Sequence, residues 1–317
     1  MVVERIEAIP LDKKTAMKYA EQIAQRNIGQ NIDSITYLGG GSFGRAFGID
    51  FADGKKIVIK FLRANDMMDK EIHDLKLLAE NCPVKIPRVL FAQKANDEIP
   101  VDCYAMDRIE GKNVLMSFST FFKSKRKRKK FADEVTTALH QIHCNKNDKF
   151  GDTLSPSFDN WLDCYKPFAQ AVLDKAEEMY REKTMSKKVI TVMRAAWAKF
   201  DIIFSEKVEE ACLIHGDLNI ANIMVTKDLQ ISGFIDPLNS TYADKEYDLF
   251  QFDNLAGKRF YLRETYTRKY GSSKYCDVKC AFYGLWNEVY CYIKTGALVN
   301  LIMNPLIKNM RKRLAEL

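Results

Sequence analysis

The sequence lacks any long apolar run. Hydrophobic residues make up 47% of its 317 residues and charged residues 29%, but no stretch approaches the roughly 18 to 20 consecutive apolar residues that a membrane-spanning helix needs. The opening stretch MVVERIEAIPLDKK carries acidic residues and no continuous apolar segment, so it does not resemble a secretory signal. We therefore expect a cytoplasmic protein without a membrane partner.

The sequence also lacks internal repeats, low-complexity linkers and closely paired cysteines. Its eight cysteines are scattered through apolar segments, without the short paired spacing of a zinc site or the density of a disulfide scaffold. Free, mostly buried thiols are the favoured interpretation.

Acidic residues are scarce toward the C-terminus. Residues 251–317 hold twelve Lys or Arg against five Asp or Glu, which equals the net charge of +7 for the whole chain. The densest basic run is KSKRKRKK, residues 123–130, which has the charge to contact phosphates of a nucleic acid or a membrane surface. Because apolar residues follow it at helical spacing, we favour a solvated amphipathic helix and expect no nucleic-acid partner.

The structural period changes near residue 112. Before it, a leading amphipathic helix in KKTAMKYAEQIAQ is followed by strand signals in SITYLGGGSFGRAFGIDF and KKIVIKFL, a helix over residues 66–81, and two more strands in RVLFAQ and VDCYAMDRI. After it, helical periodicity dominates, apart from a predicted hairpin formed by NIMVT and QISGFID. The sequence predicts an α+β fold with a small antiparallel sheet and a larger helical part.

A glycine-rich stretch, LGGGSFG, lies between the first two predicted strands. Its glycines Gly39, Gly41 and Gly44 match G-x-G-x-x-G, but a dinucleotide-binding loop would lead into a helix, and this one leads into a strand. A flexible turn is one interpretation. The functional one is a flap whose backbone N–H groups approach phosphates because no Cβ intervenes.

Lys60 lies in mid-strand between apolar neighbours, where an unpaired ammonium would be costly to bury. The following helix offers Glu71 on the stripe that continues through Leu75 and Leu78, with Asp74 as a weaker candidate. We expect Lys60 to pair with Glu71.

The stretch LIHGDLNIANIMV places Asp217 and Asn222 five positions apart, and ISGFIDP brings Asp236 to the end of an apolar strand. Each residue alone also suits a loop or a turn cap. Together, two carboxylates and an amide on a strand-loop-strand unit indicate a hard divalent cation, and Mg²⁺ fits because it needs few protein ligands.

In this order, the features resemble the protein-kinase-like phosphotransferases. Protein kinases proper usually carry H-R-D and D-F-G, whereas this chain has HGDLNIAN and FIDP and no A-P-E segment. HGDL, GFID and ADKEYDL are most similar to the small-molecule branch, which includes aminoglycoside phosphotransferases, choline kinases and fructosamine kinases. The resemblance extends from about Ile35 to Asp248.

The resemblance implies two lobes and a role for each candidate residue. Residues 1–111 would form a nucleotide-binding lobe ending in a hinge near 107–111, and residues 112–317 a catalytic, acceptor-binding lobe. The groups implied to hold ATP or GTP are the flap residues Gly39, Gly41, Ser42 and Gly44, the pair Lys60 and Glu71, and the hinge backbone at Asp107 and Ile109.

In the second lobe, Asp217 is implied to accept or orient the acceptor hydroxyl, Asn222 and Asp236 to bind Mg²⁺, and Asp248 to brace the catalytic loop. The predicted activity is transfer of a γ-phosphoryl group to a hydroxyl of a small molecule such as a sugar, sugar-amine or aminoglycoside. A fructosamine- or choline-kinase-like metabolic kinase is an alternative within this class. A nucleotide-binding pseudoenzyme scaffold is the alternative from another class.

Few acidic residues are available to a polycationic acceptor. After residue 250 the sequence offers only Asp253, Glu264, Asp277, Glu288 and Glu316. Because ammonium groups need partners when they lose water, we expect a neutral, singly cationic or anionic acceptor rather than an aminoglycoside. An aminoglycoside stays an alternative if the fold brings other acids of the helical part to the pocket, such as Asp159, Asp163, Glu209 or Glu210.

Overall fold

The computed structural model describes residues 3–317, which divide into two compact units. The sheet unit comprises Ile6–Glu80 and Lys85–Glu110. The helical unit comprises Gly111–Leu317 together with the short segments 3–5 and Asn81–Val84. The α+β class predicted from the sequence is confirmed, and no helix within residues 3–317 has the length and apolar character needed to cross a membrane.

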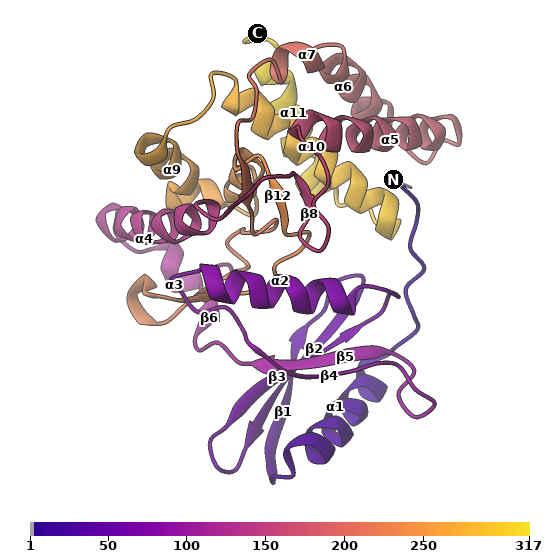
Figure 1. The fold of residues 1–317 in the computed structure, drawn as a ribbon, viewed down its shortest axis with the longest axis vertical. Helices are drawn as coiled ribbons and strands as arrows, with labels where there is room; N and C mark the ends of the chain where they lie inside the picture. Colours follow the sequence, from indigo (N-terminus) through magenta and orange to yellow (C-terminus); the bar gives the residue numbers. More distant parts are fainter. Residues whose placement is uncertain (1–2) are drawn as a thin grey trace. The chain divides into compact units, whose positions relative to one another are not determined.

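The sheet unit is built on a five-stranded antiparallel sheet in the order β1-β2-β3-β5-β4 (Figure 1). Its strands are β1 (Ile32–Gly39), β2 (Gly44–Phe51), β3 (Lys56–Leu62), β4 (Val89–Gln93) and β5 (Asp102–Asp107). Asp53 and Gly54, the latter at φ +88°, form the predicted turn between β2 and β3.

Helices cover both faces of this sheet. Helix α1 (Lys13–Ile28) is capped by Asp12, whose side chain accepts from the N–H groups of Lys14 and Thr15, and it buries its alanines and Ile23 against one face. Alternation along β3 sends Ile57, Ile59 and Phe61 into that core and Lys60 to the opposite face.

The opposite face of the sheet meets α2 (Met68–Asn81). Glu71, Leu75 and Leu78 are buried on one stripe of this helix, as the spacing predicted. The helix begins two residues later than the predicted residue 66, because Asp66 has a left-handed conformation with φ +61° and interrupts the helical backbone.

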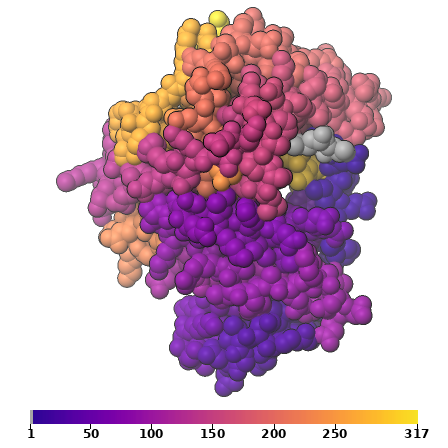
Figure 2. All heavy atoms as spheres, viewed as in Figure 1, coloured from indigo at the N-terminus to yellow at the C-terminus, as the bar shows by residue number. Residues whose placement is uncertain are grey.

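The helical unit packs around α10 (Cys276–Thr295), in which Phe282, Tyr283 and Trp286 are fully buried. The surrounding helices are α3 (Phe118–Phe121), α4 (Lys125–His143), α5 (Trp161–Arg181), α6 (Lys187–Trp197), α7 (Phe200–Ile203), α8 (Glu246–Leu249), α9 (Leu262–Tyr270) and α11 (Asn300–Leu314). Segments far apart in the sequence pack together, as with α4 and α9, and Figure 2 shows magenta and orange stretches of this unit side by side at its surface.

Two small sheets in the helical unit position its loops. One has the order β11-β10-β6, with β10 (Ile223–Val225) and β11 (Ile231–Phe234) forming the predicted hairpin beside β6 (Lys112–Asn113). The other has the order β7-β9-β12-β8, from β7 (Lys146–Asn147), β9 (Ala211–Leu213), β12 (Thr241–Ala243) and β8 (Gly151–Asp152). The loop from Ile214 to Asn222 runs from β9 to β10, so both of its ends are anchored in sheets.

Candidate active site

The predicted ion pair of the sheet unit is present. The Lys60 Nζ atom lies 2.9 Å from the Glu71 Oε2 atom, with the two side chains 15% and 9% exposed. Tyr104, which pairs with Lys60 across β3 and β5, donates its hydroxyl to the same Glu71 oxygen at 2.9 Å. Glu71 therefore holds the lysine from α2, while Tyr104 fixes the carboxylate. The weaker candidate Asp74 pairs with Lys70 instead.

The glycine-rich stretch forms the tip of the β1–β2 hairpin. Gly39 has φ +138°, which favours glycine, and a Cβ on Gly40 would lie 2.3 Å from the Gly44 carbonyl oxygen. Gly40 is thus the tightest position, although the G-x-G-x-x-G pattern does not include it. Arg45 donates to the Gly41 and Gly44 carbonyls and Arg63 donates to the Ser42 carbonyl, so two guanidinium groups hold the hairpin tip.

The predicted hinge residues lie at the end of β5. Asp107 pairs with Ile57 of β3 and accepts a hydrogen bond from Arg88 Nε at 2.8 Å, and Ile109 is buried. The next residues change unit, since Glu110 belongs to the sheet unit and Gly111 to the helical unit. Gly111 has φ +98°, and a Cβ there would lie 2.2 Å from the Val225 carbonyl oxygen.

In the helical unit, Asp248 braces the loop that carries Asp217. Its carboxylate is fully buried and accepts from the backbone N–H groups of His215 at 2.8 Å and Gly216 at 2.7 Å. His143 of α4 lies 3.1 Å from the same carboxylate through Nε2, and its Nδ1 lies 2.6 Å from the Tyr266 hydroxyl. A single carboxylate thus fixes the start of the loop to α4 and α8.

His215 is fully buried behind the loop. Burial lowers the pKa of its imidazole to about 4, so the ring is neutral at physiological pH. Its Nδ1 accepts from the Asp217 N–H at 3.3 Å, and its backbone carbonyl accepts from the Ser240 hydroxyl at 3.0 Å. The ring therefore sets the direction of the Asp217 backbone.

Gly216 permits a close backbone approach. It has φ +82°, and a Cβ would lie 2.2 Å from the Leu238 carbonyl oxygen, so the loop packs directly against the segment that follows Asp236. Gln251 donates to the Gly216 carbonyl at 3.2 Å. The spacing between the two loops is therefore fixed by backbone contact.

Asp217 is held between two amides. Asn219 Nδ2 donates to its Oδ1 at 2.9 Å and Asn222 Nδ2 donates to its Oδ2 at 2.9 Å, so both carboxylate oxygens are oriented. Burial, and next the charge of nearby Asp236, raise the pKa of the Asp217 carboxyl to about 7. The site thus has two adjacent carboxylates whose mutual repulsion a cation would relieve.

Asn222 and Asp236 lie at the same end of the β10–β11 hairpin. Ile223 pairs with Phe234, and the Asn222 carbonyl accepts from the Ile235 N–H at 2.9 Å. Asp236 has φ +54°, a conformation uncommon for a residue other than glycine and found mainly where surrounding structure enforces it. The hairpin therefore brings an amide and a carboxylate to the loop of Asp217.

These donors fit Mg²⁺. Carboxylate and amide oxygens are hard ligands, and Mg²⁺ takes few of them from protein, leaving other positions to water and phosphate. Residues 3–317 contain no cluster of three or more His, Cys, Asp or Glu side chains that would enclose a metal ion by themselves. The set suits a cation shared with a phosphate ligand rather than a closed structural site.

Cys291 of α10 also lies within electrostatic reach of Asp217, and Glu288 lies within electrostatic reach of Cys291. The pKa of the Cys291 thiol is raised to about 12 by burial and then by the charges of Glu288 and Asp217. Burial alone raises the pKa of Glu288 to about 7. Within residues 3–317 Glu288 has no ion pair or side-chain hydrogen bond, so α10 carries a half-buried carboxylate without a protein partner one helical turn before Cys291.

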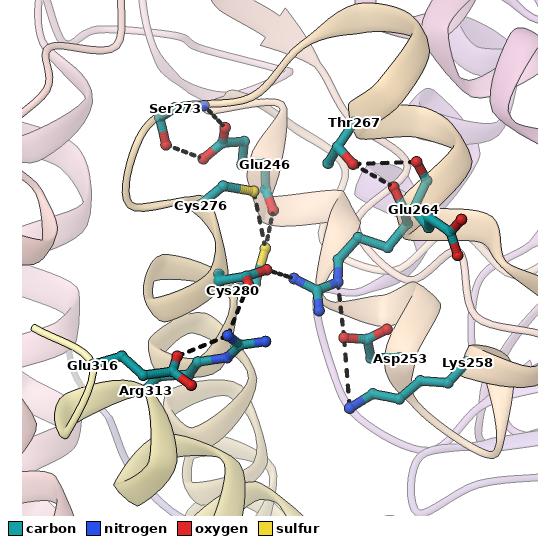
Figure 3. Close-up of polar contacts among 12 residues, drawn as sticks. Glu246, Asp253, Lys258, Glu264, Thr267, Ser273, Cys276, Cys280, Arg313 and Glu316 are labelled. Atoms are coloured by element: carbon teal, nitrogen blue, oxygen red, sulfur yellow. Dashed lines mark hydrogen bonds and ion pairs between the residues drawn. The ribbon is translucent and has the colours of Figure 1, made fainter.

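A cavity of about 530 Å³ lies elsewhere in the helical unit, between α9, the start of α10 and the turns before α9. Ser273 donates to Glu246 beside this cavity (Figure 3), and Arg263 bridges Asp253 and Asp277 in its wall. Acidic and basic side chains balance each other there, and Asp217, Asn222 and Asp236 are not among the lining residues. We do not assign the acceptor to this cavity.

The sequence did not indicate His143, Asn219 or Cys291 as parts of the site, and it named Glu288 only as one of five acids available to an acceptor. Asn219 could have been predicted from the sequence, because it lies two residues after Asp217 within the same loop. His143 and Cys291 come from α4 and α10, far from the motif in the chain, and only the packing of the helices brings them to the loop.

The sequence model of a phosphotransferase enzyme family matches residues 40–270. No curated protein matches the chain in sequence. The matched range contains the hairpin tip from Gly40, the Lys60–Glu71 pair, the loop of Asp217 and the Asp248 brace.

Solved structures show the same fold at low sequence identity. A protein from Thermobifida fusca YX-ER1 described as a fructosamine-3-kinase has a TM-score of 0.66 and 16% identity, with 93% of this chain and 98% of that chain covered. Aminoglycoside phosphotransferase APH(4)-Ia, in a ternary complex with AMP-PNP and hygromycin B, has a TM-score of 0.69, 16% identity and coverage of 93% and 97%. Aminoglycoside 2'-phosphotransferase-IIIa in a GDP complex has a TM-score of 0.69, 15% identity and coverage of 94% and 97%.

Proposed function

The chain belongs to the phosphotransferase enzyme family and is a small-molecule kinase. From this premise we propose that it transfers the γ-phosphoryl group of ATP or GTP, with Mg²⁺, to a hydroxyl of a sugar or sugar-amine. The family resemblance and the two-lobed kinase-like fold predicted from the sequence are confirmed. The nucleotide, the cation and the acceptor are the proposed part.

The observation that carries the proposal is the position of Asp217. Asn219 and Asn222 orient both carboxylate oxygens, and burial raises the pKa of the carboxyl to about 7, which strengthens it as a proton acceptor. Such a group can accept or orient the proton of an attacking hydroxyl. Asp248, His215 and Gly216 hold the loop, so little reorganisation is needed during the reaction.

Asn222 and Asp236 would hold Mg²⁺ through an amide oxygen and a carboxylate. The bound cation would neutralise phosphate charge, which is the main electrostatic demand of phosphoryl transfer. The Asn222 Nδ2 atom already donates to Asp217, so the same side chain would link the metal-binding group to the proton-accepting group.

In the sheet unit, Lys60 would bind nucleotide phosphates. Glu71 and Tyr104 position its ammonium group, and the glycines of the adjacent hairpin tip carry backbone N–H groups without side chains. The AMP-PNP and GDP complexes of the structural neighbours support a nucleotide ligand.

The Lys60–Glu71 pair gives the first prediction. Lys60→Ala should weaken nucleotide binding by roughly 10- to 100-fold, because a charge-assisted hydrogen bond contributes about 1.5–3 kcal/mol. Glu71→Gln should act in the same direction but less, and the double variant should be non-additive because both changes affect one interaction. Titration calorimetry with the nucleotide and Mg²⁺ would measure all three affinities, with Glu98→Gln, an exposed carboxylate of the same unit, as the control. Fully additive effects would refute the pairing as part of the binding site.

Glu288 supports the acceptor class. Glu288 is an unpaired, half-buried carboxylate one helical turn before Cys291, whose thiol interacts with the charges of both Glu288 and Asp217, and such a carboxylate is suited to an amino group or to hydroxyl groups of a bound acceptor. One such carboxylate favours a singly cationic sugar-amine or a neutral sugar over a polycation. The structural neighbour described as a fructosamine-3-kinase is consistent with this class.

Glu288→Gln should therefore raise the KM for an amino-sugar acceptor by about tenfold, because a charged hydrogen bond becomes a neutral one, and change the KM for a matched neutral sugar much less. The kcat should change little. Steady-state kinetics on the two acceptors would measure this split. Glu264→Gln is the matched control, because Glu264 is an exposed acid that lines the separate cavity. If the KM of Glu288→Gln equalled the wild-type KM for the amino sugar and also for the neutral sugar, Glu288 would not belong to the acceptor site.

The experiment for the acceptor itself is a turnover screen. The protein, ATP or GTP and Mg²⁺ would be incubated with sugars, amino sugars, fructosamines, choline and aminoglycosides, and mass spectrometry would detect acceptors that gain one phosphoryl group. We expect a sugar or sugar-amine to be phosphorylated most efficiently. Rapid turnover of kanamycin-like compounds at micromolar KM would contradict the proposed acceptor class.

A further inference from the structure

The segment from Met116 to Lys130 exposes aromatic side chains directly before a basic helix. Phe118 is 78% exposed and Phe122 is 83% exposed, and Met116 is 68% exposed, so three of the four most exposed large hydrophobic residues described in the structure lie within seven residues. Such a concentration differs from the single exposed apolar residues found on most soluble proteins.

The short helix α3, which carries the exposed rings, is anchored to the rest of the helical unit. Phe118 is the first residue of α3 and Phe122 its C-cap, while the Phe121 ring packs edge-on against Phe260 with ring centroids 5.2 Å apart. Thr120 is buried and donates to the Val114 and Ser117 carbonyls. The exposure of Phe118 and Phe122 is therefore a feature of an anchored turn.

The same segment holds seven Lys or Arg and no acidic residue. Asp228 pairs with both Lys123 and Lys127, which leaves one positive charge in excess there, and Glu134 approaches Lys130 at 3.7 Å. Within residues 3–317 no ion pair involves Lys125, Arg126, Arg128 or Lys129, and Arg128 and Lys129 instead lie over the Tyr261 ring at 5.7 and 5.8 Å. A net positive surface remains beside the two exposed rings.

The order of charges in α4 is unfavourable for an isolated helix. Its first turn contains Lys125, Arg126 and Lys127 and no acid, although the N-terminal end of a helix carries partial positive charge. A polyanionic surface placed there would relieve this repulsion.

We propose that Met116–Lys130, here termed the aromatic–basic surface, binds anionic phospholipid bilayers peripherally, with Phe118 and Phe122 entering the interface and the flanking cations contacting lipid phosphates. Interfacial binding depends on this combination of buried apolar area and attraction to anionic lipid. A nucleic acid fits less well, because its bases stack on a groove or platform of aromatic rings, whereas these two rings lie at the two ends of a single helical turn. The sequence alone led us to expect no membrane partner, because the exposure of these rings is not visible in it.

Vesicle co-sedimentation of the full chain tests this proposal. The protein should sediment with phosphatidylcholine vesicles containing phosphatidylglycerol but not with pure phosphatidylcholine vesicles, and added salt should weaken the binding. Phe118→Ser/Phe122→Ser should lower the partition coefficient by on the order of 10-fold, since two apolar side chains no longer leave water. The triple change Lys125→Glu, Arg126→Glu and Lys129→Glu should abolish binding.

Matched controls use other exposed positions of the same unit. Lys187→Glu/Lys188→Glu reverses two charges at the start of α6, and Leu301→Ser removes a side chain that is 86% exposed. Both should bind vesicles as the wild type does. Phe122→Trp adds a signal that does not depend on loss of binding, because its fluorescence should shift to shorter wavelength with anionic vesicles.

Three results would overturn the proposal. One is no sedimentation of the wild type with anionic vesicles. Another is an equal loss of binding in Lys187→Glu/Lys188→Glu, which would show a general charge effect. The third is a combination of two findings. Phe118→Ser/Phe122→Ser binds vesicles as the wild type does, and a labelled single-stranded oligonucleotide binds the wild type but not the triple Lys125, Arg126 and Lys129 variant, which would assign the surface to nucleic acid.

Discussion

Asp217→Asn should lower kcat by on the order of 10² to 10⁴ and leave nucleotide affinity nearly unchanged. The substitution keeps the shape of the side chain but removes the basic oxygen that would accept or orient the acceptor proton. The amide oxygen of the substituted side chain could still accept a hydrogen bond from Asn219 or Asn222, so the loop should remain in place. Steady-state kinetics and nucleotide titration on the same preparation would separate the two effects.

Asn219→Ala is the informative companion to this variant, because it removes one hydrogen bond to the Asp217 carboxylate and leaves the carboxylate itself. It should lower kcat by much less than Asp217→Asn. A kcat of Asp217→Asn within a few-fold of wild type would exclude Asp217 as the group that handles the hydroxyl proton.

Asp248→Ala should lower both the free energy of unfolding and kcat. The carboxylate is fully buried and accepts from the His215 and Gly216 backbone N–H groups, and both donors would lose their partner inside the protein. Buried donors without partners, together with His143 left beside an empty space, should destabilise the fold by about 2–5 kcal/mol. Because the same bonds position the loop of Asp217, kcat should also fall by at least about tenfold under conditions where the protein stays folded.

Chemical denaturation and kinetics well below the unfolding transition would measure these two effects. Asp201→Ala is the control, because Asp201 is an exposed aspartate whose ion pair with Lys166 should contribute less than about 1 kcal/mol. An Asp248→Ala variant as stable and active as Asp201→Ala would contradict the bracing role.

The parts of the fold that the sequence predicted are those with local signals. Alternation in β3 assigned Lys60 and Ile59 to opposite faces, and the helical stripe of α2 placed Glu71 toward the sheet, so their ion pair followed from two local patterns. Asp217, Asn222 and Asp236 were also predictable as a group, because one strand-loop-strand unit carries all three. The start of α2 was less accurate, since the left-handed backbone at Asp66 leaves little trace in the sequence.

The remaining features depend on contacts between distant segments. His143 meets Asp248 from another helix, Cys291 comes within electrostatic reach of Asp217 only through the packing of α10, and Gly40 is restricted by the carbonyl of Gly44 across the hairpin. The solvent exposure of side chains also depends on contacts between distant segments. The pattern of residues 116–122 contains three phenylalanines, and only the packing of Phe121 against Phe260 shows which of them remain in solvent.

The most direct test of the central claim is nucleoside diphosphate formation from ATP or GTP by wild type and Asp217→Asn in parallel, with and without Mg²⁺ and with and without the acceptor panel. The proposed mechanism predicts slow Mg²⁺-dependent formation without acceptor, faster formation with a hydroxylated acceptor that gains one phosphoryl group per diphosphate released, and loss of both in Asp217→Asn. Nucleotide binding without any turnover above the Asp217→Asn background would contradict it and would instead support a nucleotide-binding scaffold.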